Sequence, residues 1–209
     1  MIVLQPVLEL SDTGGFDLWP VADFEAYDFL ALGGGLSPAE VGAAVMCVAA
    51  YNRSDEPDPA DATADPVGRF LHGLLTAPAP AASGGLRAID TSTGAVLVPG
   101  CCNWLGERRD WLGVIDGDGW ASFGHHPSPL AERVGGLVRL TPDIDRPGTP
   151  VLELPVTDLP ALLTAAEHDI RAFLDLTTTW STTHLPTHTP ALRTALAQAL
   201  AVPVAQTAG

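Results

Sequence analysis

Apolar residues recur at helical spacing in two segments of the first half of the chain. The first follows Ser37-Pro38-Ala39-Glu40, a capping box with proline at the first helical position, so we expect a helix over about Pro38 to Tyr51. A second helix begins at Asp65-Pro66 and shows an i, i+3, i+4, i+7, i+8 stripe, composed of Val67, Phe70, Leu71, Leu74 and Leu75. Both patterns indicate helices with one face in a core.

The C-terminal third has the longest helical pattern. Apolar positions keep helical spacing from Leu159 to about Thr183, and Thr189-Pro190 then begins a shorter helix carrying Leu192, Leu196 and Leu200. The segment 157–202 is therefore predicted to be entirely helical.

A further helix is predicted after the adjacent cysteines of the central region. Asn103 suits its N-cap, and four residues recur at i, i+4, i+7 and i+11, namely Trp104, Arg108, Trp111 and Ile115. This spacing would place both tryptophans on one helical face. Asp116-Gly117-Asp118-Gly119 would end the helix as an ordinary turn.

Short apolar runs between turn residues predict strands. The first is residues 1–10, and Thr91-Ser92-Thr93-Gly94 joins two others, Leu86 to Asp90 and Ala95 to Val98, as a hairpin. Further strands are predicted at Trp120 to Phe123, Val134 to Leu140 and Val151 to Leu154. Residues 16–32 have no clean period and receive no assignment.

These elements predict an α+β fold, in which a small antiparallel sheet packs with about five helices and the C-terminal third is all-helical. A chain of 209 residues with 46% hydrophobic content favours a single globular domain. The segment near 52–65 lacks apolar anchors and predicts an exposed acidic loop.

The amino-acid composition excludes several classes of enzyme. The ten basic residues are all arginines, and the absence of lysine excludes P-loop, Schiff-base, kinase and Ser-Lys hydrolase mechanisms, which need an amine. No apolar run approaches the roughly 18 residues of a membrane span, and the N-terminus lacks the basic region of a signal peptide. We therefore expect a cytoplasmic protein without a membrane partner, whose three cysteines are reduced thiols.

The formal charge of -15 limits the classes of molecule that the protein is expected to bind. It opposes direct binding to nucleic acid phosphates and favours a basic protein. The alternative is that the acidity serves solubility alone.

Several motifs in the second half of the chain suggest a family. They are Pro99-Gly100-Cys101-Cys102, the pair Trp104 and Trp111, Gly124-His125 followed by Pro127-Ser128-Pro129, and the long helix that ends at Trp180 to Leu185-Pro186. Together they resemble a group of uncharacterised acidic proteins from high-GC Gram-positive bacteria, over roughly the second half of the chain. The resemblance implies no established activity, and His126 stands where the pattern has an acidic residue.

Cysteine and histidine supply the candidate chemistry. Cys101, Cys102, His125 and His126 are residue types that zinc accepts, but adjacent cysteine side chains tend to diverge, so no metal or cofactor is predicted. A small enzyme is the alternative function. In it, Cys101 or Cys102 would be a nucleophile activated by His125 and oriented by Asp110 or Asp116, with or without a metal ion.

The favoured hypothesis is a non-enzymatic module that binds a basic protein, for instance an acidic immunity or antitoxin-like inhibitor of a basic toxin. Aromatic and arginine anchors are enriched in such interfaces. The predicted contact residues are Trp104, Arg108, Asp110, Trp111, Asp116, Asp118 and His125.

Overall fold

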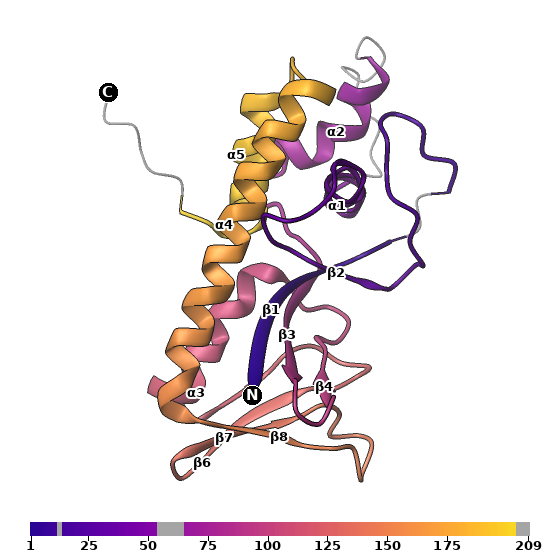
Figure 1. The fold of residues 1–209 in the computed structure, drawn as a ribbon. Coiled ribbons are helices and arrows are strands. Elements are labelled where there is room, and N and C mark those ends of the chain that lie inside the picture. The colour runs from indigo at the N-terminus through magenta and orange to yellow at the C-terminus, as the bar shows by residue number, and fades with distance from the viewer. Residues whose placement is uncertain (12–13, 54–64, 204–209) are drawn as a thin grey trace, which may run out of the picture. The chain divides into compact units, whose positions relative to one another are not determined.

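The computed structural model describes residues 1–11, 14–53 and 65–203 (Figure 1). The chain divides into two compact units: unit 1 comprises Met1–Leu8 and Ser83–Asp169, and unit 2 comprises Glu9–Ala82 and Ile170–Gly209. Most of the predicted acidic loop near 52–65 lies outside the described residues. The single domain of 1–209 stays a prediction.

The described residues form two four-stranded antiparallel sheets and five α-helices. This confirms the α+β class and the helical C-terminal third. The expectation of one small sheet is wrong, because the strands divide into the orders β2-β1-β3-β4 and β5-β6-β7-β8.

The first sheet is built around β1 (Ile2–Glu9) and β3 (Gly84–Asp90), which pair antiparallel from Ile2 opposite Asp90 to Leu8 opposite Gly84. The predicted hairpin is confirmed, since β3 continues into β4 (Val96–Leu97). Its turn is held by the Asp90 carboxylate, which accepts hydrogen bonds from Ser92 and Thr93. These bonds stabilise the ionised form and keep the pKa of Asp90 well below its usual range.

The second sheet contains β5 (Trp120–Ser122), β6 (Leu130–Val134), β7 (Leu137–Thr141) and β8 (Leu152–Pro155). The single strand predicted over Val134 to Leu140 is wrong. Gly135 has a φ of 62° and forms, with Gly136, the turn between two strands. Alternate residues point into the core of unit 1, including Ala131, Val138, Leu140, Leu152 and Leu154.

The predicted α-helix after Asn103 is also corrected. Residues Leu105–Leu112 form a 3-10 helix, η2, followed by the four-residue α3 (Gly113–Asp116). Three residues per turn place Leu105, Arg108 and Trp111 on one face, and all three are buried. Trp104 precedes the helix and is 40% exposed, so the two tryptophans do not share a face.

Asn103 does not cap this helix. It is buried, and its side-chain amide donates a hydrogen bond to the carbonyl of Gly84 at 2.7 Å. The segment after the cysteines is therefore tied to β3 through its backbone and through this amide.

In unit 2, α1 (Pro38–Tyr51) confirms the predicted helix and its capping box, since Ser37 and Glu40 exchange hydrogen bonds. Every residue from Val41 to Ala49 is buried, so α1 is enclosed on all sides and not on one stripe only. The next helix, α2 (Pro66–Thr76), starts directly after Asp65, as predicted, and the Asp65 carboxylate caps it by accepting a 2.8 Å hydrogen bond from the Gly68 amide.

The unassigned stretch 16–32 is largely irregular and contains the short β2 (Phe29–Ala31). Its main anchor is Trp19, whose indole donates to the Gly42 carbonyl at 2.9 Å. The Trp19 ring packs edge-on against Phe16, Phe70 and Trp180. Aromatic packing thus holds this segment where secondary structure does not.

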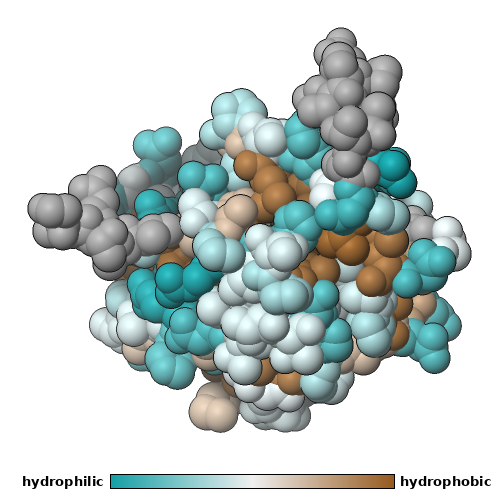
Figure 2. Space-filling model, turned by 90° about the horizontal axis from the view of Figure 1, so that it is seen from above, coloured by the Kyte–Doolittle hydropathy of each residue, from teal (hydrophilic) through white to brown (hydrophobic). Residues whose placement is uncertain are grey.

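The C-terminal helices are α4 (Leu159–His184) and α5 (Thr189–Ala199), as predicted. The start of α4 contributes Leu159 and Ala166 to the core of unit 1, while Ile170 and Phe173 belong to unit 2. No helix among the described residues is long and apolar enough to cross a membrane. On the face shown in Figure 2, hydrophobic residues form separate patches among hydrophilic and neutral ones.

Candidate metal site

Two loops of unit 1 carry the cysteines and histidines singled out in the sequence. Gly100-Cys101-Cys102 follows β4, and Gly124-His125-His126 follows β5. Their backbones pair antiparallel, because the Cys101 amide donates to the His125 carbonyl at 2.7 Å and the His125 amide donates to the Cys101 carbonyl at 3.2 Å. Residues paired in this way project their side chains to the same side, so Cys101 and His125 become neighbours.

Two glycines allow the loops to approach this closely. A Cβ atom on Gly100 would lie 2.2 Å from the Pro127 carbonyl oxygen and 2.5 Å from the His125 nitrogen. Gly124 has a φ of +91°, and a Cβ there would lie 2.5 Å from the Cys101 carbonyl oxygen. All three distances are far below van der Waals contact, so only glycine fits at either position.

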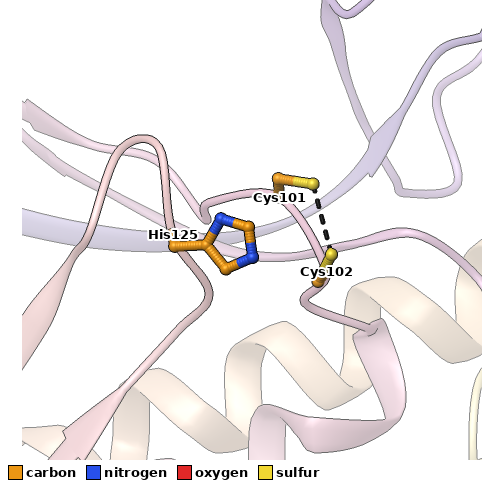
Figure 3. A group of neighbouring side chains, drawn as sticks. All are labelled: Cys101, Cys102 and His125. Carbon is orange, nitrogen blue, oxygen red and sulfur yellow. Dashed lines mark hydrogen bonds between the residues drawn. The ribbon is translucent and has the colours of Figure 1, made fainter.

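Cys102 reaches the same place through a left-handed backbone conformation, with a φ of 63°. It stands between two anchored residues, since Cys101 pairs with His125 and the Asn103 carbonyl accepts from the Gly84 amide at 3.0 Å. The sulfur atoms of Cys101 and Cys102 lie 3.3 Å apart (Figure 3). The expectation that these adjacent side chains diverge is therefore wrong.

The side chains of Cys101, Cys102 and His125 lie close enough together to act as ligands of one metal ion. One ligand atom each from Cys101, Cys102 and His125 lies within 4.8 Å of the other two, and all three residues are exposed. With ordinary zinc bond lengths, a tetrahedral ion would place its sulfur ligands about 3.8 Å apart and sulfur and nitrogen about 3.6 Å apart. The sulfur atoms, 3.3 Å apart, are about 0.5 Å closer than this, and the sulfur and nitrogen atoms, at most 4.8 Å apart, are at most about 1.2 Å farther.

The other sequence candidates lie outside this group. His126 is next to it, with its ring centroid 5.1 Å from that of His125, but it is not one of the three. Asp110 and Asp116, the predicted orienting carboxylates, are exposed and also lie outside the group. The four-residue set considered from the sequence is thus reduced to Cys101, Cys102 and His125.

Two of the predicted partner-binding residues are buried. The Arg108 side chain is 2% exposed, and its Nε donates to the Glu167 carboxylate at 2.8 Å. Trp111 is 1% exposed and stacks on Phe123, with ring centroids 4.4 Å apart. The exposed members of the predicted surface are Trp104, Asp110, Asp116, Asp118 and His125. Binding of a basic protein by these residues stays a prediction.

The buried stack also supports the site. Phe123 immediately precedes Gly124-His125, and its carbonyl accepts from the Gly100 amide at 2.8 Å. Trp111 therefore fixes the residue from which the histidine loop starts. Gly100 and Gly124 entered the sequence interpretation only as parts of the family motifs, although a glycine directly before Cys101 and before His125 is visible in the sequence.

The third cysteine lies in a different environment. Cys47 is buried in α1, and its sulfur accepts a hydrogen bond from the Ser11 amide at 3.4 Å. Burial raises the pKa of the Cys47 thiol, because the thiolate would lose its hydration. This residue therefore provides an internal reference for the two exposed thiols.

We expect iodoacetamide to modify two thiols per native chain rapidly and the third only after denaturation. Mass spectrometry of the labelled peptides should assign the fast pair to Cys101 and Cys102, because the reactive species is the accessible thiolate. Rapid labelling of Cys47 in the native protein would contradict its burial.

No protein-family model, curated protein or solved structure matches the chain. The resemblance noted from the sequence motifs stays a prediction, and function is inferred from the geometry of the chain itself.

Proposed function

We propose that this protein binds a thiophilic metal ion, with Zn²⁺ as the first candidate, through Cys101, Cys102 and His125. The observation that carries the proposal is the convergence of the three ligand atoms to within 4.8 Å of one another. Thiolate and imidazole are the ligands that zinc prefers in proteins, and thiolates also favour Cu⁺. The proposal keeps the residues and the metal ion of the alternative considered from the sequence, a small enzyme using Cys101 or Cys102 with His125, without its nucleophilic step.

The proposed site is open. Structural zinc sites usually have four protein ligands, whereas three protein ligands leave one tetrahedral position for water or another molecule. Because Cys101, Cys102 and His125 are all exposed, such a molecule can reach the ion from solvent. We infer that the bound ion can exchange with ions in solution or take part in a reaction, and that it does not stabilise the fold.

The net charge of the chain favours a bound cation. The formal charge of -15 gives the chain a negative field, which raises the local concentration of cations. Binding also requires two thiols to lose protons and the imidazole to be neutral, so the apparent affinity should fall as the pH is lowered.

The test is a titration of the reduced, metal-free protein with Zn²⁺ in the presence of a competing chromophoric chelator. We expect one ion per chain, and we expect C101S, C102S and H125A each to weaken binding by roughly 100-fold or more, since even the loss of an outer-shell partner costs about 10- to 100-fold. Co²⁺ should give a thiolate-to-metal charge-transfer band in the wild type and lose it when both cysteines are replaced.

The chain offers matched controls for every ligand. H126A removes the adjacent histidine that lies outside the group, and C47S removes the buried cysteine, so both variants should bind like the wild type. Equal affinity in C101S and the wild type, or no stoichiometric ion in the wild type, would overturn the proposal. Chelation should leave the far-ultraviolet circular dichroism unchanged, because the core of unit 1 is built without these three side chains.

A further inference from the structure

The two sulfur atoms of the candidate site are close enough to bond to each other as well as to a metal ion. Those of Cys101 and Cys102 lie 3.3 Å apart, on adjacent exposed residues. We propose that they form a reversible disulfide with peroxide as the oxidant, and that the disulfide and the bound metal ion exclude one another. The exclusion rests on the proposed metal-binding function, whereas the disulfide stands on the geometry of the thiols.

Disulfide formation needs only a local movement. The sulfur atoms must approach by about 1.2–1.3 Å to reach an ordinary S–S bond. Cys101 is held by its two hydrogen bonds to His125, and Asn103 is held by β3, so the movement falls on Cys102 and on the two side-chain torsions. The fold of unit 1 can stay as it is.

The same geometry makes the disulfide easy to reduce. Adjacent Cα atoms are about 3.8 Å apart across a trans peptide, which is shorter than the roughly 4.4–6.8 Å that disulfides usually span. The bond is therefore strained, and strained, exposed disulfides are reduced more readily than structural ones. A reversible pair is expected, in contrast to a permanent cross-link.

The chemistry balances with peroxide alone. One thiolate attacks a peroxide oxygen, so that an S–O bond forms, the O–O bond breaks and hydroxide leaves and takes up a proton. The second sulfur then attacks the sulfenic sulfur, forming the S–S bond and expelling the hydroxyl group, which leaves as water with the proton of the second thiol. Two thiols lose two electrons and two protons, and one peroxide becomes two water molecules.

His125 is placed to handle these protons. Its ligand nitrogen lies within 4.8 Å of both sulfur atoms, and its backbone is fixed by the pairing with Cys101. An imidazole nitrogen at this position can accept a proton from the attacking thiol and release it to the departing hydroxide. We expect it to influence the rate of oxidation without being required for the disulfide itself.

The metal ion and the oxidant both react with the sulfur atoms of Cys101 and Cys102. A metal ion needs both sulfurs as thiolates, whereas the disulfide leaves His125 as the single unchanged ligand of the three. Because the two states exclude each other, bound Zn²⁺ should slow oxidation and oxidation should release Zn²⁺.

The test treats reduced, metal-free protein with one equivalent of hydrogen peroxide and measures the intact mass. We expect the wild type to lose the mass of two hydrogen atoms and to keep one thiol, Cys47, that is alkylated only after denaturation. Dithiothreitol should restore the original mass and both exposed thiols. Peptide mapping should find the Cys101–Cys102 link within one chain. The oxidised protein should bind Zn²⁺ at least 100-fold more weakly, and Zn²⁺ added first should slow the mass change.

Four variants separate the two halves of the proposal. C47S should behave like the wild type, while C101S and C102S should give an oxygen adduct on the remaining exposed cysteine in place of the disulfide. H125A should still form the disulfide although its metal affinity is reduced.

A link to Cys47, a link between chains, or no loss of hydrogen would overturn the disulfide. Unchanged Zn²⁺ affinity after oxidation would overturn the exclusion. If reduced wild type binds no ion, the metal-binding function and the exclusion fail together, and the mass measurement still decides the disulfide.

Discussion

Replacing Trp111 with alanine is expected to lower the free energy of unfolding by about 3–5 kcal/mol, the range for truncating a buried large aromatic side chain. Trp111 is 1% exposed, belongs to the core cluster of unit 1 and stacks on Phe123 with an interplanar angle of 11°. The substitution removes both the buried apolar area and the ring contact, and it leaves a cavity in the core that Trp111 shares with Val114 and Ala121. Urea unfolding followed by circular dichroism measures the loss.

Trp104 provides the matched control. It is the same residue type, seven positions earlier in the chain, and it is 40% exposed. W104A should cost less than about 1 kcal/mol, because substitutions at exposed positions usually change stability little. Equal losses for W104A and W111A would contradict the assignment of one tryptophan to the surface and the other to the core.

The same pair of variants bears on the predicted protein interface. A basic partner can reach Trp104 without any rearrangement, whereas Trp111 is enclosed. Weaker partner binding in W104A at unchanged stability would therefore support the exposed part of that surface. Weaker binding in W111A would be explained by damage to the core.

The second large effect is expected at Gly124. G124A should lower the free energy of unfolding by roughly 2–4 kcal/mol, because a left-handed backbone costs an alanine about 1 kcal/mol and a steric clash in a packed region adds about 1–3 kcal/mol. The new Cβ would lie 2.5 Å from the Cys101 oxygen and 2.7 Å from the Gly100 oxygen, and both are backbone atoms that cannot rotate away.

Zn²⁺ binding should be lost in the same variant. The clash forces apart the two loops that bring Cys101 next to His125, while all three proposed ligands remain in the sequence. Chromophoric-chelator competition would measure the affinity of G124A under conditions where circular dichroism shows it to be folded. Wild-type affinity in the folded variant would mean that loop pairing does not assemble the site.

Alanine substitutions at two glycines of another turn distinguish the cost of a left-handed backbone from the cost of the steric clash at Gly124. Gly135 has a φ of +62°, and no atom lies within 4 Å of the position that a Cβ would take there; Gly136 is equally open without the left-handed φ. We expect the destabilisation to decrease in the order G124A, G135A, G136A, with Zn²⁺ binding intact in the last two. If G135A were as destabilising as G124A, the close approach of the loops would contribute nothing.

Local signals in the sequence were sufficient for most of the helices. The capping box at Ser37 and the cap at Asp65 set the starts of α1 and α2, because the groups that satisfy the first amides of a helix lie within the next few residues. The long apolar period likewise determined α4, and Thr189-Pro190 determined the start of α5. These features need no information from distant parts of the chain.

Where the sequence pattern predicted the wrong element, the actual conformation depends on tertiary packing. Trp104 and Trp111 fit an α-helical period, but the core buries Leu105, Arg108 and Trp111, which share a face only at three residues per turn. The apolar run from Val134 to Leu140 fits one strand, yet Gly135 and Gly136 reverse the chain so that its two parts pair with each other.

The candidate site shows the same division. The residue types of the site, two thiols and an imidazole, and the negative net charge without lysine can be read directly from the sequence. Their meeting depends on the fold, since Cys101 reaches His125 through a single backbone bridge between two loops, and Cys102 turns back through a left-handed conformation beside the anchored Asn103. Side-chain chemistry belongs to each residue, whereas a binding site depends on distances that only the folded backbone sets.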